Sequence, residues 1–444
     1  MAKTFRAWDV DQAWLLPPSV HDFVPVGHAA HLIRNLVRES LDLTAIFDAY
    51  PEDRGQPPYH PAMMTALLLY AYSRGVYASR RIAVACEERV DVMAVTGMQR
   101  PDFRTISDFR KRHLAALGAL FVQVLGLCRE AGLVKLGHVA LDGTRIKANA
   151  SKHKAMSYGR MVQAEAALAQ EVAGWLAAAE AADVADDAEL GADRRGDELP
   201  AWVADKAARL AKIRAAKAAL EAAARDQAEA AADGDPAAAE PAPQPRRGRP
   251  PKTPPGTPKA KAQRNFTDPD SRIMKTKDGF IQGYNAQAAV DGEAQVIVAH
   301  GLTNGSDQAQ LTPLVDAIQS NTGRPPKEVS ADAGYCSEAN LEALDARGIR
   351  GYVATGRQRH GQAAATGRGR HHGPRVRAMR TRLRRGGFRS RYRLRKHTVE
   401  PVFGQIKQAR GFRQFLLRGL DKVEHEWALV CTAHNLTKLT RALA

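Results

Sequence analysis

Cysteine is scarce in this sequence. Only four occur in 444 residues, at positions 86, 128, 336 and 431. No two of them are closely spaced, which excludes a CxxC zinc framework and gives no sign of a disulfide-stabilised domain. Isolated cysteines fit a reducing compartment, so we expect a cytoplasmic protein.

Long apolar runs are also missing. The longest one near the N-terminus, MMTALLLYAY from Met63, is much shorter than the roughly 20 residues that cross a bilayer. The first residues, MAKTFRAWDVDQAW, lack the apolar core of a secretion signal. We therefore expect no membrane partner and no export.

Acidic residues are absent from one long stretch. Between Asp345 and Glu400 there is no Asp or Glu, although arginine recurs throughout. The whole chain has a formal net charge of +17, from 65 Lys and Arg against 48 Asp and Glu. A surplus of this sign attracts polyanions, and Phe388 and Tyr392 lie among the arginines as in segments that grip nucleic acid. We expect residues 356–397 to be irregular and to contact DNA; a disordered basic arm is the alternative.

The spacing of apolar residues divides the sequence into segments with different predicted structures. Apolar residues spaced by three and four from about residue 28 to 136 predict a helical N-terminal domain, residues 1–136, with exposed arginines suited to DNA. A solvated basic face on a helical bundle explains those arginines equally well. Residues 151–232 predict an inserted helical hairpin, and residues 233–265 a flexible, basic, Pro-rich linker.

The period becomes two from about residue 279. FIQGYNAQAAVD and AQVIVAHGLT predict paired strands, followed by alternating helices and strands, and helices return over 398–443. Together with a strand in residues 137–150, residues 266–444 therefore predict a mixed α/β core with helices packed on its sheet.

Three acidic residues stand out by position. Asp142 follows HVAL and Asp332 follows EVSA, so both are expected at the C-terminal ends of strands, where functional groups collect. Glu400 is expected at the start of a helix, with Thr398 as its N-cap and Pro401 in its first turn.

These carboxylates suit phosphodiester chemistry. Three of them can hold two hard divalent cations, while nearby Arg and Lys side chains hold the flanking phosphates. Taken singly, each has a plain alternative as a turn or capping acid, because Asp-Gly commonly forms turns. Taken together, the three carboxylates favour a catalytic role over a role in turns and caps.

At these positions the sequence resembles insertion-sequence transposases of the DDE class, in particular a bacterial group with a Tyr-Arg-Glu-Lys signature. The likeness rests on ALDGT around Asp142, ADAGY around Asp332 and the stretch from Tyr392 to Lys407. The segments PPYHPAMMTALLLYAYSRGVYASRRI and TGMQRPDFRTISDFRKRH also resemble the N-terminal helical domain of that group.

The resemblance implies an RNase H-like catalytic core with Asp142, Asp332 and Glu400 as the metal-binding triad for Mg²⁺ or Mn²⁺, two ions being expected. It implies cleavage and joining of double-stranded DNA at terminal inverted repeats and into target DNA, by a homodimer in the nucleoid. Tyr392, Arg395 and Lys407 are the implied DNA-contacting residues. The signature usually leaves three residues between Arg and Glu, and four occur here, so Lys396 is an alternative to Arg395.

The linker contains PRRGRPPK, which resembles an AT-hook that inserts Arg247 and Arg249 into a narrow minor groove. A plain polycationic linker is the favoured alternative. For the whole protein, the alternatives to a transposase are a DNA-binding protein that keeps the fold without the chemistry, and a metal-dependent nuclease without strand transfer.

Overall fold

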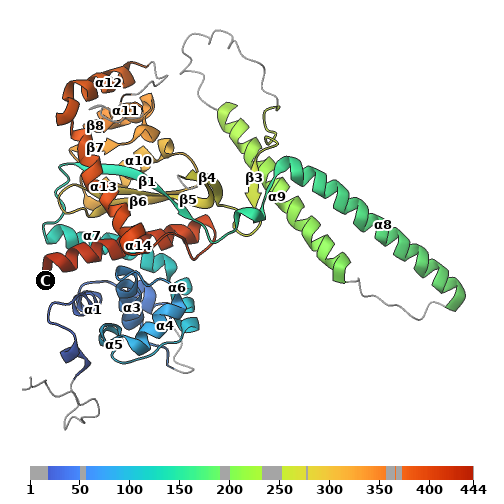
Figure 1. Cartoon of the computed structure of the whole chain (residues 1–444), viewed down its shortest axis with the longest axis horizontal. Coiled ribbons are helices and arrows are strands. Elements are labelled where there is room, and N and C mark those ends of the chain that lie inside the picture. The colour runs from blue at the N-terminus through green and yellow to red at the C-terminus, as the bar shows by residue number, and fades with distance from the viewer. Residues whose placement is uncertain are drawn as a thin grey trace, which may run out of the picture. The chain divides into compact units, whose positions relative to one another are not determined.

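The computed structural model of the chain describes residues 19–50, 57–190, 201–232, 253–276, 279–356, 366 and 373–443. The chain divides into two compact units, shown with their elements in Figure 1. The first combines Met1–Ile146 with Asn285–Ala444, and the second is Lys147–Tyr284. Arg247 and Arg249, the two arginines of the AT-hook-like motif, lie outside the described residues.

The first unit begins with helices, as the apolar spacing predicts. They are α1 (Ala29–Glu39), α2 (Thr44–Phe47), α3 (Pro61–Ser73), α4 (Ser79–Glu88), α5 (Val90–Thr96), α6 (Phe103–Arg112) and α7 (Leu114–Glu130). Helix α3 is apolar around its whole circumference and almost completely buried, because α1, α5 and the C-terminal helix α14 (Leu420–Leu443) pack around it.

A mixed sheet of six strands follows. The five strands that lie wholly or mostly in the first unit are β1 (Val139–Lys147), β5 (Gly279–Asp291), β6 (Ile297–Thr303), β7 (Glu328–Ala331) and β8 (Arg350–Val353). Their order is β6-β5-β1-β7-β8. Strands β5 and β6 are antiparallel, whereas β7 is parallel to both β1 and β8. The predicted mixed α/β architecture is thus confirmed.

Helices pack on this sheet between and after its strands. They include α10 (Leu311–Thr322), α11 (Glu338–Ala346) and α13 (Leu394–Gly404). The C-terminal α14 lies against α7 and β6 (Figure 1). Its Trp427 indole donates a hydrogen bond to the backbone carbonyl of Gln287 at 2.9 Å, and its Asn435 amide pairs with both backbone groups of Ile297.

The prediction of an irregular segment over 356–397 is wrong for its second half. Helix α12 (Pro374–Gly386) forms there, with Val376, Met379 and Leu383 buried on one face. The arginines between them hide this three-and-four spacing in the sequence. The Glu338 carboxylate on α11 caps α12 by accepting the backbone N–H groups of its first residues, Arg375 and Val376.

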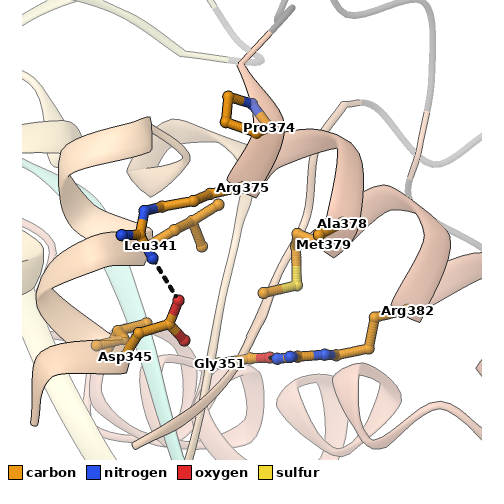
Figure 2. A pocket seen from close by; sticks show the side chains of 9 residues that line it. Leu341, Asp345, Gly351, Pro374, Arg375, Ala378, Met379 and Arg382 are labelled. Atoms are coloured by element: carbon orange, nitrogen blue, oxygen red, sulfur yellow. Dashed lines mark hydrogen bonds and ion pairs between the residues drawn. The ribbon is translucent and has the colours of Figure 1, made fainter.

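Two arginines tether α12 further. Arg375 pairs with Asp345 on α11 at 2.9 Å, and Arg382 donates to the backbone carbonyl of Gly351 on β8 at 3.0 Å. Between these elements lies a pocket of about 290 Å³, which Figure 2 shows with Met379 pointing into it. None of the predicted site residues lines this pocket.

The second unit is built around two long helices, α8 (Tyr158–Leu190) and α9 (Ala201–Ala232). Their ion pairs and hydrogen bonds run antiparallel, from Tyr158 with Glu221, through Glu165 with Lys217, to Glu171 with Lys206. Short strands β2 (Ala155–Ser157) and β3 (Gln263–Asn265) pair beside them, and β4 (Arg272–Thr276) pairs with the first residues of β5.

Within the described residues, no single helix is both long and apolar enough to cross a membrane. Only α6 and α7, which are bent by 72° from each other, meet those requirements as a pair, by length and composition alone.

Candidate active site

Asp142 and Asp332 occupy equivalent places on two adjacent parallel strands. The pairing of β1 with β7 ends at Leu141 opposite Ala331, and each aspartate is the next residue along the chain, Asp142 within β1 and Asp332 directly after β7. Parallel strands bring such residues to the same edge of their pairing. The sheet therefore places two carboxylates side by side, although they are 190 positions apart in sequence.

Asp142 does not end its strand, contrary to the prediction. Strand β1 continues past it to Lys147, and the Asp-Gly pair forms no turn. Gly143 is needed for close packing, since a Cβ atom there would lie 2.5 Å from the Gln287 amide and 2.6 Å from the Asn285 side-chain oxygen. Strand pairing with β5 overrides the turn preference of this dipeptide.

Glu400 lies inside its helix, so the predicted N-cap role of Thr398 is wrong. Helix α13 begins at Leu394, directly after a 3₁₀ turn, η7 (Arg391–Arg393), and Thr398 donates to the Leu394 carbonyl at 2.8 Å. Pro401 is also interior. Proline cannot donate to the carbonyl of His397, and that carbonyl accepts the Gln295 amide at 2.9 Å instead.

The Arg395 guanidinium joins two of the three carboxylates. Its Nη1 donates to Asp142 Oδ2 at 2.5 Å, and its Nη2 donates to Glu400 Oε1 at 3.1 Å. Arg395 and Asp142 are mostly buried, whereas the Glu400 side chain is 46% exposed. Lys396, the alternative to Arg395, is exposed and has no hydrogen bond or ion pair within the described part of the chain.

The electrostatics of the two aspartates reflect their burial. Burial raises the pKa of Asp142 to about 6, opposed by Arg395 and reinforced by the charge of Asp332. Burial also raises the pKa of Asp332, although the Gly334 N–H donates to its Oδ1 at 2.8 Å. Asp142 and Asp332 together carry more negative charge than the single Arg395 guanidinium beside them can neutralise.

Tyr392 and Lys407 brace the helix that carries Arg395 and Glu400. The Tyr392 ring is buried and lies beneath the Arg395 guanidinium, 6.0 Å from ring centroid to Cζ. Lys407 lies in the π-helical turn η8 (Gln405–Ala409) that continues α13. Its ammonium donates to the Thr144 hydroxyl at 3.0 Å and to the Arg145 carbonyl at 3.1 Å, which ties the helix to β1 beside Asp142.

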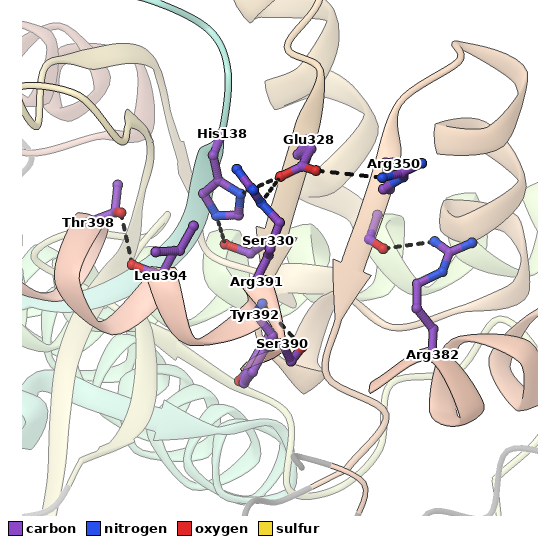
Figure 3. Close-up of polar contacts among 11 residues, drawn as sticks. His138, Glu328, Ser330, Arg350, Arg382, Ser390, Arg391, Tyr392, Leu394 and Thr398 are labelled. Atoms are coloured by element: carbon purple, nitrogen blue, oxygen red, sulfur yellow. Dashed lines mark hydrogen bonds and ion pairs between the residues drawn. The ribbon is translucent and has the colours of Figure 1, made fainter. Parts of the chain in front are cut away.

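A second ion cluster fixes the start of this helix (Figure 3). The Glu328 carboxylate, on β7, pairs with the Arg391 guanidinium of η7 and with His138, whose other ring nitrogen lies 3.0 Å from the Ser330 hydroxyl. Since Arg391 directly precedes Tyr392, this cluster holds the chain in place just before Arg395 and Glu400.

Two family models match parts of the chain. The model of the family described as Transposase DDE domain matches residues 231–436, which include Asp332 and Glu400. A second model, described as Transposase domain (DUF772), matches residues 18–112, the N-terminal helices. The chain belongs to the DDE transposases. No curated protein and no solved structure matches it.

The donor chemistry of this transposase fits a hard divalent cation. Mg²⁺ and Mn²⁺ prefer carboxylate oxygens, and two mostly buried, mutually repelling carboxylates lie here with an arginine as a counter-charge. Among the described residues no three His, Cys, Asp or Glu side chains are grouped to hold a metal ion. The Arg395 guanidinium lies between Asp142 and Glu400.

Sequence reasoning missed a polar network beneath the two aspartates. Asn285 and Gln287 on β5 both donate to Asp307 Oδ1, at 2.6 and 2.8 Å, and the Tyr335 hydroxyl donates to the Gln287 side-chain oxygen. Asn285, Gln287 and Tyr335 are all buried. The signal in the sequence was the pair of amides inside an otherwise apolar strand, FIQGYNAQAAVD, because buried amides require partners.

Proposed function

We propose that this transposase binds the terminal inverted repeats of an insertion sequence and catalyses metal-dependent strand cleavage and strand transfer. The centre would consist of Asp142, Asp332 and Glu400. The observation that carries the proposal is the adjacency of Asp142 and Asp332 on parallel strands, with Glu400 joined to Asp142 through Arg395. The sheet order β6-β5-β1-β7-β8, with helices on it, supports an RNase H-like core.

Each residue of the chain has a distinct task in this proposal. Asp142, Asp332 and Glu400 hold the Mg²⁺ or Mn²⁺ ions, two being expected, and their carboxylates must be deprotonated to do so. Such ions lower the pKa of an attacking water or 3′-hydroxyl and stabilise charge on the leaving oxygen. Arg395 must release at least one carboxylate when a cation binds, and its guanidinium is then available to a DNA phosphate.

In this proposal the arginine-rich residues 373–399 would hold the DNA. Residues 373–399 contain no acidic residue, and helix α12 presents arginines away from its buried face. Arginines of this density neutralise phosphates without reading the sequence. Lys396 is exposed beside the centre and would contact the same backbone. The N-terminal helices are proposed to recognise the element ends, with both ends held by a homodimer and, in the linker, with Arg247 and Arg249 as an additional minor-groove contact.

The test is cleavage and joining of duplexes that carry the element ends, in Mg²⁺, with binding measured in parallel. We expect Asp142→Asn, Asp332→Asn and Glu400→Gln each to lower cleavage by more than about a hundredfold while DNA binding persists. Asp316→Asn is the matched control, since it removes one carboxylate of a half-exposed surface pair with Arg347.

The products separate the proposal from its rivals. Cleaved and joined products together support a transposase activity, whereas cleaved products alone support a nuclease without strand transfer. Binding by all proteins and cutting by none, across several element ends and both metals, would overturn the catalytic proposal in favour of a DNA-binding protein.

A further inference from the structure

A fourth carboxylate lies against the chain segments that follow both aspartates. Asp307 is the first residue of a 3₁₀ turn, η4 (Asp307–Gln310), after β6. A Cβ atom on Gly143, the residue after Asp142, would lie 2.7 Å from Asp307 Oδ1. A Cβ atom on Gly334, two residues after Asp332, would lie 2.9 Å from Asp307 Oδ2 and 3.0 Å from Asp332 Oδ1. Glycine at both positions makes room for the Asp307 carboxylate.

The orientation of Asp307 is fixed by buried donors. Its Oδ1 accepts both the Asn285 amide, at 2.6 Å, and the Gln287 amide, at 2.8 Å. Gln287 is fully buried and is held in turn by the Tyr335 hydroxyl. The two lone pairs of Oδ1 are therefore used. Within the described residues, Oδ2 accepts no hydrogen bond, and it faces Gly334 beside Asp332.

A carboxylate is an unexpected choice for a purely structural role here. An asparagine would also accept both amides through its Oδ1, and it would add no charge. The charge of Asp307 repels that of Asp332, and this repulsion disfavours the folded state unless a cation compensates it. Its negative charge, its fixed rotamer and its free oxygen all suit a cation at the two aspartates.

We propose that Asp307 is a positioning residue of the centre, whose fixed negative charge favours a divalent cation at Asp142 and Asp332. The inference rests on the proposed function, because that proposal places the cation at these aspartates. Residues that orient metal ligands typically change metal affinity by about 10- to 100-fold when they are replaced.

The test is a calorimetric titration that measures Mn²⁺ binding to the full chain without DNA. Asp307→Asn keeps an Oδ1 for Asn285 and Gln287 and removes the charge at Oδ2. We expect it to weaken Mn²⁺ binding about tenfold or more. The control Asp316→Asn removes one charge from a half-exposed surface pair with Arg347 that includes no residue of the centre, and it should bind Mn²⁺ like wild type.

A second measurement keeps the test valid if Asp307→Asn is less stable than wild type. The rise in unfolding temperature caused by Mn²⁺ compares each protein with itself, since a ligand stabilises only the state that binds it. We expect this rise to shrink in Asp307→Asn and to stay unchanged in Asp316→Asn. An equal rise in Asp307→Asn and wild type would overturn the inference.

The aspartate variants separate this inference from the proposed function. If Asp142→Asn and Asp332→Asn weaken Mn²⁺ binding but Asp307→Asn does not, Asp307 is only structural and the proposed centre stands. If Asp142→Asn and Asp332→Asn leave Mn²⁺ binding unchanged, the cation site of the proposed function fails, and the role of Asp307 fails with it.

Discussion

The Arg395 guanidinium lies between two carboxylates, 2.5 Å from Asp142 Oδ2 and 3.1 Å from Glu400 Oε1. It occupies the place in which the proposed function requires a divalent cation. In the proposed function its positive charge would therefore compete with metal binding, in a site where both Arg395 and Asp142 are mostly buried and poorly screened by water.

Replacement of Arg395 should tighten metal binding. We expect Arg395→Gln to bind Mn²⁺ about tenfold more tightly than wild type in the absence of DNA, equivalent to about 1.4 kcal/mol, because no side-chain cation has to be displaced. DNA cleavage should fall in the same variant, since the guanidinium is lost. The measurement is calorimetric titration, with the neighbour Arg393→Gln as control. Weaker Mn²⁺ binding in Arg395→Gln would show that the arginine orders the carboxylates instead.

Gly75 should be intolerant of a side chain. It follows α3 with a φ of +80°, and a Cβ atom there would lie 2.7 Å from the backbone carbonyl of Arg410. Gly132 has a similar φ of +74°, but a Cβ atom on it would meet no atom within 4 Å. We expect Gly132→Ala to cost about 1 kcal/mol of unfolding free energy from backbone strain, and Gly75→Ala about 1–3 kcal/mol more. Urea unfolding measures both, and equal losses would show that Arg410 moves aside freely.

Glu426 should make stability depend on pH. Its carboxylate is buried on α14 and accepts the backbone N–H groups of Leu416 and Leu417 at 3.0–3.1 Å. Burial raises the pKa of Glu426 to about 7 from its ordinary value of 4.5. The folded state thus binds more protons than the unfolded state between these pH values, so the contribution of Glu426 is full below about pH 4.5 and is lost as the pH rises through 7.

The matched variant for this prediction is Glu426→Gln, which does not titrate. Between pH 4.5 and 7 the unfolding free energy of wild type should fall by about 3 kcal/mol relative to the variant, since one pKa unit corresponds to about 1.4 kcal/mol. Urea unfolding at both pH values gives this difference, in which all other titrating groups cancel. Parallel pH profiles for the two proteins would contradict the prediction.

Much of the fold could be predicted from the sequence. The alternating apolar pattern identified β5 and β6, and the three-and-four spacing identified the N-terminal helices, because each pattern reflects one buried face. Asp332 was placed correctly at the end of its strand, since the strand before it is short and apolar.

The features that could not be predicted from the sequence depend on tertiary contacts. Asp142 was predicted to end its strand, but β5 keeps β1 extended past it. Helix α12 was hidden by its arginines and is capped by Glu338, a residue from another helix. The position of Arg395 between two carboxylates, and of Asp307 against Gly143 and Gly334, could not be inferred from spacing, because these contacts join segments far apart in the chain.

The order of the strands also has an evolutionary consequence. The second unit, Lys147–Tyr284, begins at the last residue of β1 and ends within β5, and these two strands are neighbours in the sheet. The chain therefore leaves the first unit and re-enters it on adjacent strands. A gene of this design can gain, lose or exchange the intervening sequence in one event while Asp142, Asp332, Arg395 and Glu400 keep their places.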